Sequence, residues 1–123
     1  MKHEDDFVQA LMVQIVYRAA TVASNSGTPW WPPSDTCSEW QDLPPIQLGG
    51  FVVTNEGDFD RWATISCAGK SVTTELGSKR IFMYGRRNTG EPATIQEWCE
   101  WFDAVMVELN RIDDEAIRKI RGR

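Results

Sequence analysis

The stretch TIQEWCEWFDAVMVELNRI, residues 94–112, carries the clearest structural pattern in the sequence. Thr94 followed by Glu97 forms a capping box, in which the two side chains bond free backbone N–H groups at a helix start. Apolar residues then recur at the three- and four-residue spacing of one helix face: Ile95, Trp98, Cys99, Phe102, Val105, Met106, Leu109 and Ile112. This pattern predicts a long amphipathic C-terminal helix. The acidic run 113–115 predicts a short, separate terminal helix that ends in the basic residues 118–123.

Residues 50–87, which precede this helix, alternate between apolar and polar side chains in short segments. Turn-forming runs separate the segments: Asn55-Glu56-Gly57-Asp58, Ala68-Gly69-Lys70 and Gly77-Ser78. The pattern predicts three to four antiparallel strands joined as a β-meander. Ser and Thr gather on one side of these strands, so we expect that face to be solvated and the aliphatic face to meet the helices.

Residues 4–24 predict a first helix whose apolar stripe is unusually wide. Its core positions are Val8, Leu11, Met12, Ile15, Val16, Ala19, Val22 and Ala23, and Val13, Tyr17 and Ala20 widen the stripe. One neighbouring element does not cover so much surface. The stripe therefore favours either a helix engulfed by its own fold or a homodimer with this helix at the interface.

Residues 25–49 interrupt the regular patterns. The run Asn25-Ser26-Gly27 predicts the end of the first helix, and five of the six prolines follow within this segment. Proline removes a backbone donor and fixes φ, which predicts a long loop without regular structure. Trp30, Trp31 and Trp40 lie within it. Long loops are often functional, so these tryptophans are candidate partner-binding residues.

The 123 residues suffice for a single α+β domain. The net charge of −5 argues against non-specific binding to nucleic acid or anionic membranes and permits binding to a basic protein partner. Acidic residues 4–6 precede the first apolar stretch, unlike a signal peptide, and polar residues interrupt that stretch, so no membrane span is expected. The widely spaced Cys37, Cys67 and Cys99 predict three free thiols. Together these features predict a cytoplasmic protein.

The residue types also argue against an enzyme. The sole histidine in the sequence is His3, near the terminus, which leaves no Ser/His or Cys/His constellation and no histidine-based zinc site. The sequence contains no phosphate-binding or dinucleotide-binding glycine motif. We therefore expect no catalysis, no cofactor and no metal. Carboxylate-based catalysis stays open as an alternative, although no acid pair can be identified.

An acidic row lies opposite the apolar stripe of the C-terminal helix. It comprises Glu97, Glu100, Asp103 and Glu108, accompanied only by Arg111. Solvated helix faces normally mix both signs, so a row of one sign indicates a surface that docks on a basic groove. Trp101 lies at the edge of the stripe beside these acids, and we expect it to be an exposed interface anchor.

The predicted strand at 79–87 supports an alternative function. Basic residues flank two aromatic residues there, as in surfaces that stack and neutralise single-stranded nucleic acid: Lys79, Arg80, Phe82, Tyr84, Arg86 and Arg87. This pattern leaves a nucleic-acid accessory protein as the second hypothesis.

The predicted order of one helix, three strands and one helix resembles the double-stranded RNA-binding domain. That family has a basic start to its last helix, whereas Glu91, Glu97 and Glu100 stand here, so its function does not transfer. The small size, low pI and α+β layout also resemble dimeric secretion chaperones, toxin-immunity proteins and phage-encoded inhibitors of bacterial defence. That resemblance implies a non-enzymatic inhibitor or chaperone that works by binding a protein.

Overall fold

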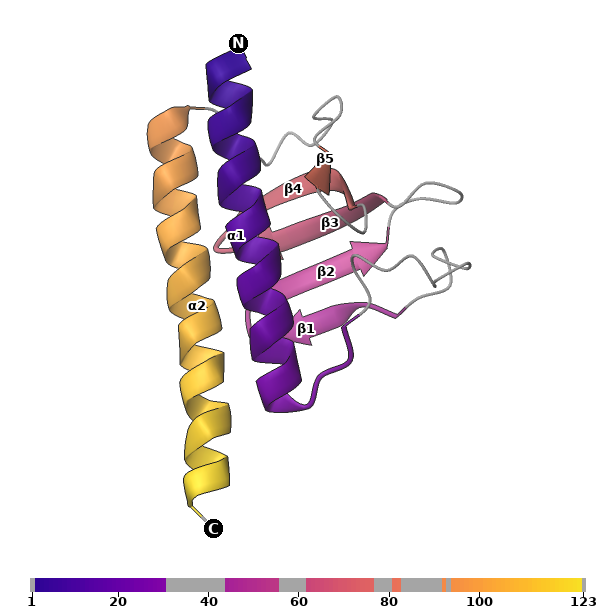
Figure 1. Ribbon diagram of the computed structural model, residues 1–123, viewed down its shortest axis with the longest axis vertical. Helices are drawn as coiled ribbons and strands as arrows, with labels where there is room; N and C mark the ends of the chain where they lie inside the picture. Colours follow the sequence, from indigo (N-terminus) through magenta and orange to yellow (C-terminus); the bar gives the residue numbers. More distant parts are fainter. Residues whose placement is uncertain are drawn as a thin grey trace.

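The computed structural model describes residues 2–30, 44–55, 62–76, 81–82, 92 and 94–122. It consists of two long helices packed against one antiparallel sheet (Figure 1). The elements in chain order are α1 (Lys2–Ser26), β1 (Ile46–Leu48), β2 (Phe51–Asn55), β3 (Trp62–Cys67), β4 (Lys70–Leu76), β5 (Ile81–Phe82) and α2 (Ile95–Arg121). This arrangement confirms the predicted α+β class, with an N-terminal helix, an antiparallel sheet and a long C-terminal helix.

The sheet is a meander in which each strand pairs with the next one along the chain, in the order β1-β2-β3-β4-β5. Two residues with positive φ, Ala68 at 53° and Gly69 at 79°, form the tight turn between β3 and β4. Such turns match the twist of a hairpin. On the outer face, the hydroxyl groups of Thr64 and Thr73 lie 2.9 Å apart across these two strands. The predicted polar face is therefore present.

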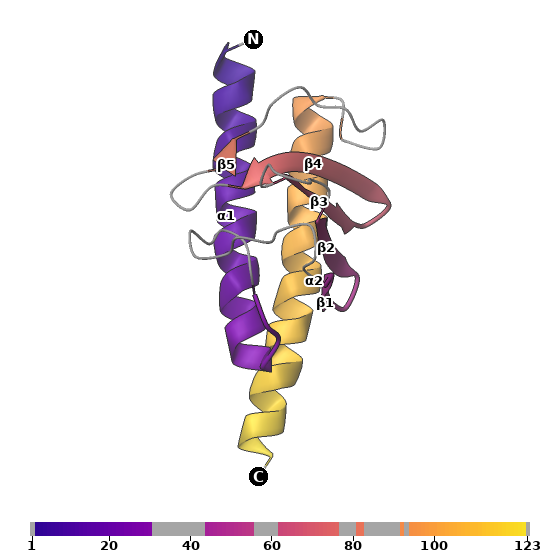
Figure 2. The ribbon, with the colours of Figure 1, turned by 90° about the vertical axis from the view of Figure 1, so that its right-hand side faces the viewer.

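The inner face of the sheet supplies part of the core. Its buried side chains alternate with the outward-facing ones, as the pleat requires: Ile46, Leu48, Phe51, Val53, Ala63, Ile65, Cys67 and Val72. The two helices supply the larger part, and α1 crosses this face (Figure 2).

Two predicted boundaries in the first half of the chain need correction. The helix continues to Ser26, and the segment expected to be a loop up to residue 49 contains strand β1. Ile46 and Leu48 are buried on either side of an exposed Gln47, and they pair with Val53 and Phe51. A three-residue alternation is too short to stand out in the sequence, but an adjacent strand stabilises it. The sheet thus has five strands, where three to four were predicted.

The apolar stripe of α1 lies inside the fold. Val8, Met12, Ile15, Ala19 and Val22 are each at most 1% exposed, because the helix packs against both the sheet and α2. In the described chain, Asp6–Ser26 is long and apolar enough, by length and composition alone, to cross a membrane. The buried stripe supplies much of that apolar composition. Engulfment, one of the two readings of the wide stripe, is therefore what the structure shows for these residues.

Helix α2 runs in the same direction as α1, so both helices begin at one end of the molecule (Figure 1). Thr94 caps it as predicted, since its side-chain oxygen accepts a hydrogen bond of 3.1 Å from the Glu97 N–H. The prediction of a separate terminal helix that starts at 113–115 and ends in residues 118–123 is wrong, because α2 continues unbroken to Arg121. The sequence between residues 95 and 121 contains no Gly or Pro to break it.

Candidate functional site

Trp101 corrects the predicted partner-binding surface. It is only 2% exposed, and its indole N–H donates a 2.9 Å hydrogen bond to the Cys67 carbonyl. The ring packs edge-on against buried Trp98, with 5.7 Å between the ring centroids. The prediction that Trp101 is an exposed anchor is wrong, because the end of the sheet at the β3–β4 turn covers the edge of the helix stripe on which it lies.

The outward face of α2 carries charges along its whole length. Glu100 and Asp103 are exposed near its start, and we find no partner for Asp103 among the described residues. Farther along the helix, this surface turns basic with Arg111, Arg118, Lys119 and Arg121, among which Asp114 and Glu115 also lie. The acidic row therefore occupies only the first half of the helix.

Val107 lies between the acidic and basic halves of this face. Its side chain is 69% exposed, which makes it the most exposed large apolar residue in the described chain. Its role is not predictable from the sequence, because a single apolar residue opposite a helix stripe gives no distinctive signal. The structure thus puts Val107, rather than Trp101, beside the exposed acids.

The other two acids of the predicted row contact the rest of the chain. The Oε1 atom of Glu97 lies 3.9 Å from the Nζ atom of Lys70, the first residue of β4. Glu108 accepts a 2.6 Å hydrogen bond from the Gly50 N–H and forms an ion pair of 2.7 Å with Arg111. The hydrogen bond from Arg111 is the larger cause, and that from Gly50 the smaller one, of a Glu108 carboxyl pKa lowered to about 2. Glu108 is thus a clamp on the β1–β2 turn and contributes less to any outward surface than Glu100 and Asp103.

A shallow depression of about 240 Å³ lies beside Val107. Its walls come from α2 and from two turns of the sheet: Gly50, Cys67, Ala68, Ala104, Val107 and Glu108. Burial, and secondarily the charge of Glu108, raise the pKa of the Cys67 thiol. A raised thiol pKa lowers the fraction of reactive thiolate, so this residue does not act as an activated nucleophile. The depression is smaller than typical small-molecule pockets, which begin near 300 Å³.

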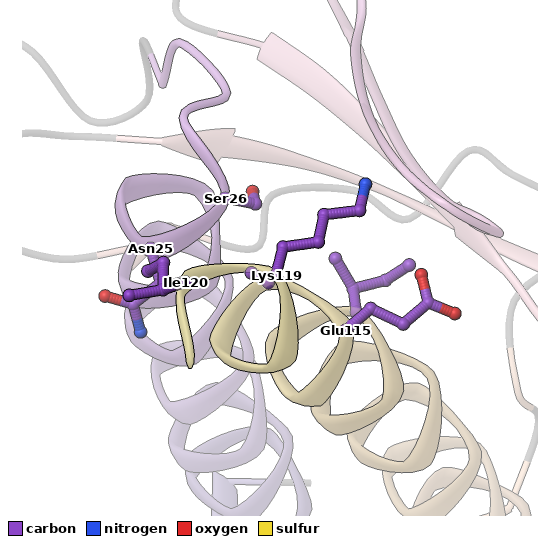
Figure 3. A pocket seen from close by; sticks show the side chains of 7 residues that line it. Asn25, Ser26, Glu115, Lys119 and Ile120 are labelled. Carbon is purple, nitrogen blue, oxygen red and sulfur yellow. The ribbon is translucent and has the colours of Figure 1, made fainter. Parts of the chain in front are cut away.

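A second depression, of about 230 Å³, separates the end of α1 from the last turns of α2 (Figure 3). Next to it, Asp113 accepts hydrogen bonds from Arg18 at 3.0 Å and from Asn25 at 2.8 Å. Arg18 also donates to the side chain of Asn110. These residues lie 88 to 95 positions apart in the chain, so no sequence pattern announces the network. It fixes the two helices against each other and leaves Asp113 as the buried charged residue of the described chain.

Most of the other predicted site residues fall outside the described chain. Trp30 is described, and it is half-buried against the core, with no described acceptor for its indole N–H. Trp31 and Trp40 lie outside the described residues, as do Lys79, Arg80, Tyr84, Arg86 and Arg87 of the alternative site. Phe82 belongs to β5, but its side chain is not described. The nucleic-acid hypothesis therefore stays a prediction.

The described cysteines and acids form no disulfide and no metal site among the described residues. Cys67 and Cys99 are free thiols, and Cys37 lies outside the described residues. Within the described ranges, no group of three or more His, Cys, Asp or Glu side chains could hold a metal ion. Comparisons of this chain with protein-family models, with curated proteins and with solved structures found no match.

Proposed function

We propose that this is a non-enzymatic protein-binding protein, of the inhibitor or chaperone type, that docks on a basic surface of its partner. The docking surface is the acidic patch of α2, which consists of Glu100, Asp103 and Val107. The observation that carries the proposal is the juxtaposition of two outward carboxylates with an apolar side chain that is 69% exposed.

The chemistry of this patch suits a protein partner better than a small molecule. Protein interfaces place an apolar contact at the centre and charged groups at the rim, where the charges steer association and set its salt dependence. The neighbouring depression of about 240 Å³ would accept one side chain of the partner, such as the stem of a lysine or arginine. The negative net charge of −5 favours the approach of a basic surface. Binding of this kind requires neither cofactor nor metal, and its expected location is the cytoplasm.

The proposal can be tested with an immobilised octapeptide of alternating arginine and leucine. Glu100→Lys combined with Asp103→Lys should weaken binding about tenfold or more and flatten its dependence on salt. The matched control is Asp114→Lys with Glu115→Lys, which changes the net charge equally on the basic half of the same helix. The control should change binding by less than about threefold.

Two outcomes would contradict the proposal. If both double variants weakened binding equally, net charge alone would explain the attraction and the acidic patch would be an ordinary solvated face. If Val107→Ser left the affinity unchanged while the acids mattered, the apolar element would have no part in binding. Circular dichroism of each variant confirms that the fold is retained before binding is compared.

A further inference from the structure

The outward face of α1 is chemically unlike that of α2. Six exposed residues follow one another at alternating spacings of three and four: Phe7, Ala10, Gln14, Tyr17, Thr21 and Ser24. None of them carries a charge, and Tyr17 is 59% exposed. Spacings of three and four keep side chains on one seam of a helix, as in the a and d positions of a coiled coil. We refer to these six residues as the α1 seam.

The described part of the fold does not cover this seam. The sheet packs on one side of α1 (Figure 2), where the buried stripe lies, whereas all six seam residues are exposed. A surface helix normally places charged residues opposite its buried stripe. Loss of charge together with exposed aromatic rings is instead the composition of an interface core. The seam spans the 18 residues from Phe7 to Ser24, or roughly 26 Å of helix.

The charges around the seam identify its occupant. Asp6 at the start of α1 and Glu97, Glu100 and Asp103 at the start of α2 lie at one end of the molecule. Arg118, Lys119 and Arg121 lie at the other end, where α2 extends past α1 (Figure 1). A second copy that packs head to tail on the seam brings the acidic end of each chain beside the basic end of the other. A head-to-head copy brings like charges together at both ends.

The side-chain sizes along the seam also suit a second copy in the head-to-tail direction. When the two seams are aligned about their common midpoint, Phe7 lies opposite Ser24 of the other copy. In the same alignment Ala10 lies opposite Thr21, and Gln14 opposite Tyr17. The largest apolar ring thus meets a small residue, and the two central polar side chains can hydrogen-bond. Small residues permit the close approach of two helices at 8–10 Å.

We infer that the α1 seam pairs with the same seam of a second copy, in an antiparallel dimer with two-fold symmetry. The pairing uses the face of α1 that points away from the sheet, and the buried stripe stays in the core of each chain. One pair of helices makes a small interface, so the dimer dissociates on dilution. The pairing of the two seams does not require that the acidic patch of α2 bind a basic partner, although the antiparallel direction uses the charges of Glu100 and Asp103.

The first experiment measures the mass of the full chain by light scattering and sedimentation across a dilution series. We expect twice 14.0 kDa at high concentration and 14.0 kDa after dilution. Tyr17→Glu should raise the dissociation constant of the dimer about tenfold or more, because it puts a charge in the seam. The matched control is Val107→Glu, which puts the same charge at an exposed apolar site of α2 outside the seam and should leave the dissociation constant of the dimer unchanged. A mass of 14.0 kDa at every concentration up to about 1 mM, or equal effects of both variants, would overturn the inference.

The second experiment tests direction. Arg118→Glu with Arg121→Glu should weaken an antiparallel dimer, since the basic end then repels the acidic end of the other copy. In a parallel dimer the same variant relieves repulsion between two basic ends, so tighter association would contradict the antiparallel arrangement. An uncharged helix face could instead bind a lipid surface, and sedimentation of the chain with phosphatidylcholine vesicles tests this alternative. Retention of the wild-type chain on vesicles that Tyr17→Glu abolishes, without any dimer in solution, would assign the seam to a lipid surface instead.

Discussion

The two helices have similar inward faces and opposite outward faces. Both bury an apolar stripe, which the buried Asp113 interrupts in α2, and both span the length of the core. Outside, α2 is acidic in its first half and carries both signs with a basic last turn in its second half, whereas the α1 seam carries no charge. The inward faces pack the single chain, so the contrast between the outward faces bears on the two proposals made above. We interpret the charged face as a surface for a basic partner and the uncharged seam as a surface for a second copy.

Trp101 lies on the inward face of α2, and the largest expected effect concerns this residue. Trp101→Ala should lower the free energy of unfolding by about 3–5 kcal/mol, because it opens a cavity beside Trp98. Trp101→Phe should cost less, since it fills most of the space and loses only the hydrogen bond to the Cys67 carbonyl. Urea unfolding followed by circular dichroism measures both values.

The control for this prediction is Val107→Ala on the outward face of the same helix. It should change the free energy of unfolding by no more than about 0.5 kcal/mol, as is usual for exposed sites. Similar losses of stability for Trp101→Ala and Val107→Ala would mean that α2 does not have one buried and one exposed face, which contradicts the contrast drawn with α1.

At Asp113 a charged side chain of α2 turns inward and contacts α1. Asp113→Ala should cost about 1–3 kcal/mol, since Arg18 and Asn25 each lose a hydrogen-bond acceptor at the partly buried contact between the helices. Asp114→Ala, one position along and exposed, is the control and should be nearly neutral. Chemical denaturation of the two variants under identical conditions distinguishes them. Equal stability of the two would show that the network does not hold the helices together.

Local signals in the sequence predicted most of the fold correctly. The capping box at Thr94 and the turn at Ala68-Gly69 depend on neighbours within four positions, so the sequence contains the whole of each signal. Strand β1 was missed, because its three residues become a strand only through pairing with β2. The unbroken course of α2 through Asp113 depends on contacts with α1 more than eighty positions away.

The candidate site was less predictable than the fold. A helical projection places Trp101 at the edge of the apolar stripe, but it cannot tell which edge the sheet will cover. The same limit applies to Glu108, which the projection assigns to the acidic row and the structure turns toward Gly50. The uncharged seam of α1 was missed, because only Tyr17 of its six residues belongs to the wide apolar stripe that the sequence predicts. Which residues of α1 stay exposed is decided by the packing of the helix against the sheet and α2.

Glu108 gives the smallest expected effect, and it tests whether the acidic row is divided as the structure has it. Arg111 and Gly50 stabilise the ionised carboxylate in the folded chain, so its pKa lies at about 2, below the ordinary value of about 4.3. A carboxyl group whose pKa is lowered by folding stabilises the fold above its ordinary pKa. That contribution falls as the pH decreases from about 4.5 toward 2.

Glu108→Gln should therefore be less stable than the wild type at pH 7, and the difference should narrow over that acid range. Urea unfolding of both proteins at pH 7, 4 and 2.5 measures the difference. Asp103→Asn is the matched control, because an outward acid with no described partner loses no hydrogen bond and its replacement should leave the stability at pH 7 nearly unchanged. If the two variants lowered the stability at pH 7 equally, Glu108 would belong to the outward row with Glu100 and Asp103, and the acidic patch would extend along α2 to the Gly50 turn.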